Sequence, residues 1–158
     1  MTRINSAIPV RQLTDEHLLA EHREIKRLPA HFRQALSTGA LRRIPKKFCL
    51  GPGHVNFFLN KQAFLFNRYQ AIHKECVRRG FNVEEYSDNW LILRPLMEKA
   101  NCWNNYSPTA EEKALLIERI SDRTLVSKKK HFHYYGRPIA KEKAIDLLNN
   151  NAPDLWEE

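Results

Sequence analysis

The sequence has little cysteine and no long apolar run. Its three cysteines, Cys49, Cys76 and Cys102, are widely spaced and form no CxxC pair, so neither a disulfide framework nor a zinc site is expected. No apolar stretch reaches the length of a transmembrane helix, and the N-terminus lacks the basic and apolar regions of a signal peptide. These absences argue against a secreted disulfide scaffold and a membrane protein. They predict a cytoplasmic location with reduced thiols.

Positive charge, by contrast, is in excess. The 158 residues, enough for one domain with a real core, carry 26 Lys and Arg against 18 Asp and Glu, which gives a net charge of +8. An acidic partner such as nucleic acid is therefore expected. Charge alone would suit DNA, RNA or an anionic membrane equally well.

The most informative stretch is residues 2–32, most of which we expect to be helical. Thr14 is a good N-cap, and two acidic residues follow it in the first turn. The helix is expected to run to Gly39 with a kink at Pro29, because proline removes a backbone hydrogen bond. One face is apolar and is predicted to pack on the core through Leu18, Ile25, Phe32 and Leu36.

The opposite face of this helix carries charged groups around a small residue. In angular order it reads Arg23, Arg27, Ala20, Glu24 and His17. The alanine leaves room for a ligand between the basic pair and the acid. An ordinary solvated helix face would carry similar charges, so the pattern predicts either a ligand site or a solvated face.

The N-terminus supplies a candidate nucleophile. Met1 precedes the small Thr2, and a small second residue is the usual condition for removal of the initiator methionine. A free α-amine has a pKa of about 7.7–8.0 against about 10.4 for lysine, so roughly one in eight is neutral at pH 7. Every protein has an N-terminus, but this amine needs no pKa tuning to act as a nucleophile.

Two further helices are expected along the chain. Asn60 is a plausible N-cap for a second helix that ends at Gly80. Ser107 and the proline after it are expected to open a third helix that runs to about Arg123. The buried line of this third helix is predicted to consist of Ala110, Ala114, Ile117 and Ile120.

The remaining segments are expected to contain little regular structure. Residues 83–106 are interpreted as a loop with short turns, and residues 140–148 as a short extra helix. With no alternating strands, the chain is predicted to be all-α, a compact single domain over residues 1–158 with about three main helices, long loops and a short C-terminal helix.

Two loops contain residue types that are suited to ligands. The segment Gly51-Pro52-Gly53-His54 lacks the lysine and hydroxyl ending of a P-loop, so His54 is interpreted as a structural, hydrogen-bonding histidine. Residues 127–137 interleave lysines with aromatic rings, a composition that suits phosphates and bases. The alternative is that Tyr134 and Tyr135 close the core. His131 and His133 lack the companions of a metal site.

Five blocks occur along the chain in the order MTRIN, DEHLLAEHREIKR, LGPGHVNFF, KECVRRGFNV and HYYG. Together they resemble the pyrimidine-dimer DNA glycosylase/AP lyase family of the phage endonuclease V type, over roughly residues 1–136. The resemblance implies an all-α DNA repair enzyme without metal or other cofactor, acting as a monomer on double-stranded DNA that contains pyrimidine dimers or abasic sites. Residues 139–158 extend past the usual family end.

The resemblance also implies roles for individual residues. The α-amine of Thr2 would attack the sugar of the 5′ nucleotide of the dimer and form an imine, and Glu24 would stabilise the charge on the sugar and assist β-elimination. The residues expected to contact DNA are Arg3, His17, Arg23, Lys26, Arg27, Asn82, Arg119, Tyr134 and Tyr135. His17 would also orient Glu24.

Several residues depart from the family pattern. Glu16 stands where a glutamine is common and His22 where an aromatic residue is usual, and His131 and His133 lie in a segment that is otherwise rich in Trp and Tyr. A negative Glu16 near DNA is expected to weaken binding. The main alternative function is a non-catalytic or abasic-site-directed DNA-binding protein on the same scaffold, and the third is an RNA-binding basic protein.

Overall fold

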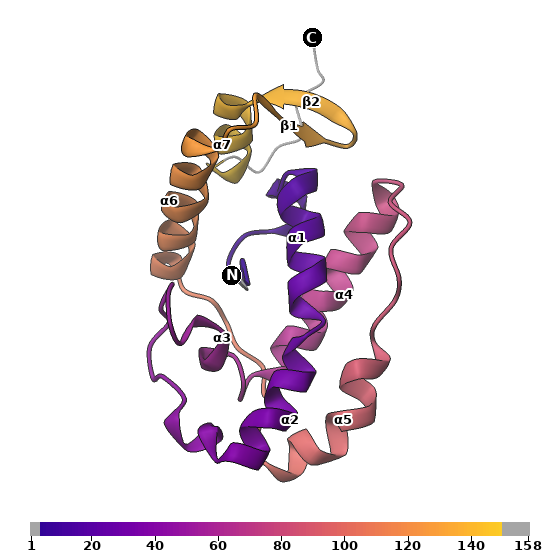
Figure 1. Ribbon diagram of the computed structural model, residues 1–158, viewed down its shortest axis with the longest axis vertical. Helices are drawn as coiled ribbons and strands as arrows, with labels where there is room; N and C mark the ends of the chain where they lie inside the picture. Colours follow the sequence, from indigo (N-terminus) through magenta and orange to yellow (C-terminus); the bar gives the residue numbers. More distant parts are fainter. Residues whose placement is uncertain (1–3, 150–158) are drawn as a thin grey trace.

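The computed structural model describes residues 4–149 and is mostly helical, with one small sheet (Figure 1). The helices are α1 (Asp15–Ile25), α2 (Leu28–Thr38), α3 (His54–Phe57), α4 (Gln62–Arg78), α5 (Asp88–Lys99), α6 (Ala110–Val126) and α7 (Lys141–Asn149). The strands β1 (His131–Tyr134) and β2 (Arg137–Ala140) form an antiparallel hairpin. The prediction of a mainly helical fold is confirmed, whereas three main helices and the absence of strands are wrong.

The first predicted helix is divided into α1 and α2. Thr14 caps α1 as expected, because its side chain accepts a hydrogen bond from the backbone N–H of His17 at 3.2 Å. The chain leaves the helix after Ile25 and re-enters it at Leu28. Pro29 therefore lies in the first turn of α2, where its missing N–H costs no helical hydrogen bond. The predicted kink is in fact a break.

The break changes which face of α2 is buried. Leu18 and Ile25 of α1 are fully buried, as predicted. In α2 the buried positions include Phe32 and Ala35, whereas Leu36 is 41% exposed, contrary to the prediction. The buried face was predicted for one continuous helix. The turn between α1 and α2 interrupts the helical periodicity, so the prediction does not hold for α2.

The second helix, α4, ends as predicted but begins differently. Gly80 follows it with a φ of +85°, a left-handed conformation that glycine adopts without cost. At the start, Asn60 is not the cap. The backbone N–H of Gln62 instead donates to the carbonyl of Cys102 at 2.9 Å. A tertiary contact thus satisfies the start of α4.

The segment predicted as a loop contains the helix α5. Its buried residues are Trp90 and Met97, while Leu91, Ile92 and Leu96 are exposed. Apolar residues on both sides of the helix blur its periodicity, and Pro95 inside it is a residue type that normally argues against a helix. These two features explain why the pattern predicted a loop.

The third predicted helix is α6, with a different cap and a different buried line. Thr109 caps it, because its hydroxyl accepts from the N–H of Glu112 at 3.2 Å. Of the four residues predicted to be buried, only Ile120 is. The buried residues, spaced four apart, are Glu112, Leu116, Ile120 and Thr124.

A buried ion pair joins the N-terminal segment to α1 and α4. Arg68 on α4 donates to both carboxylate oxygens of Glu21 on α1, at 2.8 and 2.9 Å, and to the carbonyl of Ile8 at 2.6 Å. The side chains of Glu21 and Arg68 are 0% and 7% exposed. Such a paired, fully hydrogen-bonded charge fixes relative position well, since separating it would leave an uncompensated charge in the core.

The hairpin and α7 lie at one end of the molecule, beside the start of α1 (Figure 1). The carboxylate of Asp15 accepts hydrogen bonds from the backbone N–H groups of Tyr135 and Gly136, at 3.1 and 2.8 Å. The predicted C-terminal helix is confirmed as α7, whose buried Ala144 and Leu147 form a small second core with the hairpin.

Within residues 4–149, no helix has the length and apolar character needed to cross a membrane.

Candidate active site

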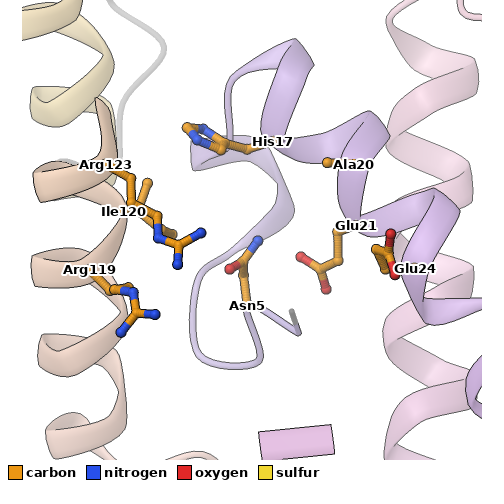
Figure 2. Close-up of a pocket in the computed structure, with 8 residues that line it drawn as sticks. All are labelled: Asn5, His17, Ala20, Glu21, Glu24, Arg119, Ile120 and Arg123. Atoms are coloured by element: carbon orange, nitrogen blue, oxygen red, sulfur yellow. The ribbon is translucent and has the colours of Figure 1, made fainter. Parts of the chain in front are cut away.

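A cavity of about 210 Å³ lies between α1, α6 and the N-terminal segment (Figure 2). It is the place where some of the candidate residues of the first helix meet residues that are distant in sequence. Its lining consists of Asn5 from the N-terminal segment, His17, Ala20, Glu21 and Glu24 from α1, and Arg119, Ile120 and Arg123 from α6.

The α1 side of the cavity is acidic and has room at its centre. Ala20, Glu24 and His17 line it together, which is the arrangement that the helical spacing predicted. Glu21 is engaged by Arg68 and serves the fold. Glu24 reaches solvent, with 24% of its side chain exposed, and one of its oxygens lies 3.5 Å from Nη1 of Arg27. Glu24 is therefore the carboxylate placed to meet a ligand.

The α6 side of the cavity is basic. Arg119 and Arg123 are one helical turn apart, and Figure 2 shows both arising from the same helix and pointing toward the acidic side. The sequence placed Arg119 at the site through the family resemblance but treated Arg123 as a solvent-side cation. The spacing of four was the available signal, because residues four apart share a helix face. Two guanidinium groups on one wall suit phosphate.

Asn5 is a site residue that the sequence analysis missed. Only 5% of it is exposed, and its carbonyl oxygen Oδ1 is buried without a hydrogen-bond partner among residues 4–149. A buried polar atom left unsatisfied costs about 1–3 kcal/mol. In Figure 2 the Asn5 side chain lies between Arg123 and Glu21. An acceptor in this position is suited to a donor supplied by a ligand or by water.

His17 lines the cavity and also supports the start of α1. Its Nδ1 lies 2.8 Å from Oγ1 of Thr14, and its ring stacks on Phe132 of the hairpin with centroids 5.5 Å apart. Burial lowers the pKa of His17, an effect that the neighbouring Glu16 carboxylate opposes only in part. The ring is therefore neutral at pH 7. The predicted role of orienting Glu24 stays a prediction, since the hydrogen bond described for the ring is to Thr14.

Four other predicted DNA contacts lie outside this cavity. Arg23 and Asn82 are exposed, and 60% of the Arg27 side chain is exposed. Lys26 turns toward Tyr86, with Nζ 3.2 Å from the phenol oxygen and 4.4 Å from the ring centroid. Arg23, Arg27 and Asn82 are therefore surface residues outside the cavity lining, whereas the ammonium of Lys26 already has a partner.

The two predicted residues at the N-terminus, Thr2 and Arg3, lie outside the described residues. The first described residue, Ile4, is fully buried, and Asn5 lines the cavity. Two residues of chain span at most about 7 Å, so the backbone N–H of Ile4 limits how far from the cavity the amine of Thr2 can be.

Tyr134 and Tyr135 are occupied by contacts within the protein. Tyr134 is 2% exposed and donates from its hydroxyl to the carbonyl of Arg11 at 2.9 Å, while the Tyr135 hydroxyl donates to Glu75 at 2.6 Å. The guanidinium of Arg79 lies over both rings, 4.8 and 4.9 Å from their centroids. This geometry favours the alternative that the tyrosines close the core, and it leaves the buried Tyr134 ring no face for a base.

Two of the departures from the family pattern contact one another. The Glu16 carboxylate accepts from the backbone N–H of His133 at 3.0 Å and lies 2.6 Å from its ring Nδ1. Burial by itself would raise the pKa of Glu16, but the hydrogen bonds from His133 outweigh burial and lower it. The carboxylate of Glu16 thus has partners within the protein, on the hairpin. There is therefore less reason to expect that Glu16 weakens DNA binding.

A third departure, His22, is expected to make the stability of the protein sensitive to acid. The residue is 4% exposed, its Nε2 lacks a hydrogen-bond partner in the described part of the chain, and burial together with the neighbouring His73 and Lys26 lowers its pKa. An unfolded histidine takes up a proton near pH 6.5, whereas the buried ring resists it. The contribution of His22 to stability is therefore present above that pH and is lost as the pH falls below it.

We expect His22→Phe to reduce this acid sensitivity. Urea unfolding midpoints measured between pH 7.5 and 5 should fall less steeply for the variant than for the wild-type protein. The same change at the exposed His31 is the matched control and should leave the pH dependence as it is. Parallel curves for His22→Phe and the wild type would show that His22 is not the group responsible.

The fold and the site together indicate a class of protein. A basic, mostly helical scaffold with a carboxylate and two arginines facing each other across a cavity is suited to chemistry on a phosphate-bearing polymer. Within residues 4–149 no group of three His, Cys, Asp or Glu side chains is arranged to hold a metal ion.

Comparison with protein-family models identifies the particular family. The model described as pyrimidine dimer DNA glycosylase matches residues 1–89, more than half of the chain. The chain belongs to the pyrimidine dimer DNA glycosylase family and is, by that membership, a DNA repair enzyme. The match includes Thr2, Arg3, His17 and Glu24. It ends before α6, so Arg119 and the HYYG block rest on resemblance and on the geometry above.

Proposed function

We propose that this protein is a bifunctional DNA glycosylase and AP lyase that excises the 5′ base of cyclobutane pyrimidine dimers and then cleaves the strand. The observation that carries the proposal is the meeting of Glu24 with the N-terminal segment at one cavity, which Asn5 lines three residues after Thr2. The arginines on α6 supply the phosphate contacts that a DNA substrate requires.

The first step uses the Thr2 amine as the nucleophile. Its nitrogen forms a bond to the anomeric carbon of the sugar while the glycosidic bond breaks, and the base leaves with the bonding electrons and takes up a proton. Positive charge develops on the sugar in this step, and the Glu24 carboxylate stabilises it electrostatically. Loss of an amine proton and opening of the sugar ring then give the imine.

The second step breaks the strand. Glu24 assists removal of a proton from the 2′ carbon, and the electrons move toward the imine while the 3′ phosphate leaves. The imine is the electron sink, so the proposed step calls for no metal or other cofactor. To reach the sugar, the DNA has to bend and a nucleotide has to leave the stack, at a cost of a few kcal/mol. A dimer already weakens pairing, which lowers this cost.

The experiment that tests this function is borohydride trapping on two duplexes, one with a dimer and one with an abasic site. Mass spectrometry of the cross-linked peptide should place the adduct on the α-amine of Thr2, with Met1 absent. An adduct on a lysine would overturn the choice of nucleophile. Tight binding to damaged DNA with neither adduct nor cleavage would favour the non-catalytic DNA-binding alternative.

The arginines of α6 are expected to contribute separately to DNA binding. Arg119→Ala and Arg123→Ala should each weaken binding and lower the slope of log affinity against log salt by about one unit, if each neutralises one phosphate. Arg94→Ala is the matched control, since Arg94 lies on α5, pairs with Glu98 at 2.8 Å and stacks on Trp103. Titrations of the same duplex at several salt concentrations measure the slope.

An unchanged slope would assign the arginine concerned to the solvated surface. The same measurement decides between phosphate contact and solvation for the basic residues that lie beside the cavity or outside the described chain. These are Arg3, Arg23, Lys26 and Arg27.

A further inference from the structure

The ring of His54 joins the N-terminal segment to the loop before α3. The backbone N–H of Ile4 donates to Nε2 of His54 at 2.9 Å, and Nδ1 of the ring lies 2.8 Å from the carbonyl oxygen of Cys49. An amide N–H can only donate and a carbonyl can only accept. The ring is therefore neutral, with its proton on Nδ1, and each ring nitrogen is assigned to one partner.

The surroundings of the ring hold it in one orientation. His54 is 4% exposed, and Phe48 and Phe58 pack edge-on against it with centroids 5.5 and 5.4 Å away. The preceding Gly53 has a φ of +94°, and a Cβ atom there would meet Pro45 at 3.3 Å. The loop thus follows a tight path that directs the ring toward the N-terminal segment.

A nucleophile at a chain terminus has a particular weakness. A side-chain nucleophile is held by backbone on both sides, whereas a terminal amine has only the chain that follows it. Terminal residues are poorly ordered unless contacts hold them in place. Here the backbone bond of Ile4 to His54 is the first hydrogen bond described along the chain, two residues from the proposed nucleophile.

We infer that His54 is the positioning residue for the N-terminal nucleophile. By accepting from the N–H of Ile4, it fixes the backbone from which the Thr2 amine extends and from which Asn5 reaches the cavity. This inference rests on the proposed function, because it gives a role to His54 only if the amine reacts. His54 acts through the N-terminal segment and not by contact with the substrate.

Two substitutions separate positioning from packing. The side-chain amide of asparagine ends near the place of Nδ1, so His54→Asn can keep the contact with Cys49 but leaves Ile4 without an acceptor. The glutamine side chain is longer, and the oxygen of its amide reaches the place of Nε2, so His54→Gln can accept from Ile4. If His54 served only to pack the loop, both variants would be impaired to a similar extent.

The test is single-turnover borohydride trapping on a duplex with an abasic site, together with equilibrium binding to that duplex and thermal unfolding. We expect His54→Asn to trap on the order of a hundredfold more slowly with unchanged affinity, since a misplacement of about 1 Å can cost that much. His54→Gln should restore most of the rate. Should His54→Asn fail to fold, His54→Met replaces it in the comparison, because a thioether is at best a weak acceptor.

The outcomes distinguish this inference from the proposed function. Wild-type trapping beside an equally fast His54→Asn variant, or equal losses in the Asn and Gln variants, would overturn the inference and leave the function intact. Absence of trapping by the wild-type protein would overturn the function and the inference with it.

Discussion

One extra residue before Thr2 is expected to lower the rate of imine trapping by about a hundredfold or more. An added residue moves the terminal amine by up to about 3.6 Å. A misplacement of about 1 Å in a near-attack geometry can already cost a hundredfold. The chain cannot slide to absorb the change, because Ile4 is buried and its N–H is bound to His54.

The measurement is single-turnover trapping and strand cleavage on a duplex with an abasic site. The control variant carries the same added residue after Glu158, at the other end of the chain, and should react at the wild-type rate. A protein that retains Met1 also has one extra residue before Thr2, so it provides the same test. Full activity of either N-terminally extended protein would contradict the assignment of the α-amine as the nucleophile.

Glu24→Gln is expected to separate DNA binding from chemistry. The amide nearly preserves the volume of the side chain, but it has no charge to oppose a developing positive sugar and cannot act as a base. Loss of a preorganised group of this kind costs about 2.7–4 kcal/mol, or a hundred- to a thousandfold in rate. The affinity for dimer-containing DNA should stay the same or rise, because the substitution removes a negative charge from the cavity that the two arginines of α6 also line.

Cleavage and binding should be measured on the same dimer-containing duplex. Glu118→Gln, an exposed position on α6, is the matched control, because it makes the same change in net charge away from the cavity lining. Near-normal cleavage by Glu24→Gln would remove Glu24 from the mechanism. Loss of both binding and cleavage would show that Glu24 supports the first helix instead.

The parts of the fold that were predicted correctly depend on local signals. The cap at Thr14, the end of α4 at Gly80 and the helix α7 each follow from residues close together in sequence. The start of α4 could not be predicted in this way, since the carbonyl that satisfies Gln62 comes from Cys102. The hairpin was missed although the exposed and buried residues of β1 alternate, because four residues are too short a run to decide a period.

The part of the candidate site that lies on α1 could be predicted from the sequence, whereas the contribution of other elements could not. Helical spacing alone brought His17, Ala20 and Glu24 to one face, where the cavity lies. The position of Arg123 opposite that face depends on how α6 packs, which no local pattern reveals. The contact between Glu16 and His133 joins residues 117 positions apart and had appeared in the sequence as two separate departures.

The docking of the hairpin on α1 determines how short a working fragment of this protein can be. The family match ends at residue 89, yet the first turn of α1 obtains hydrogen bonds from Tyr135 and Gly136, and Tyr135 in turn bonds to Glu75. A fragment that ends at residue 89 would lose these partners. The side chain of Glu75, which is 0% exposed in the structure, would then lose the cover that Tyr135 provides. We therefore expect the minimal folding unit to extend through the hairpin, well beyond the part of the sequence by which the family is recognised.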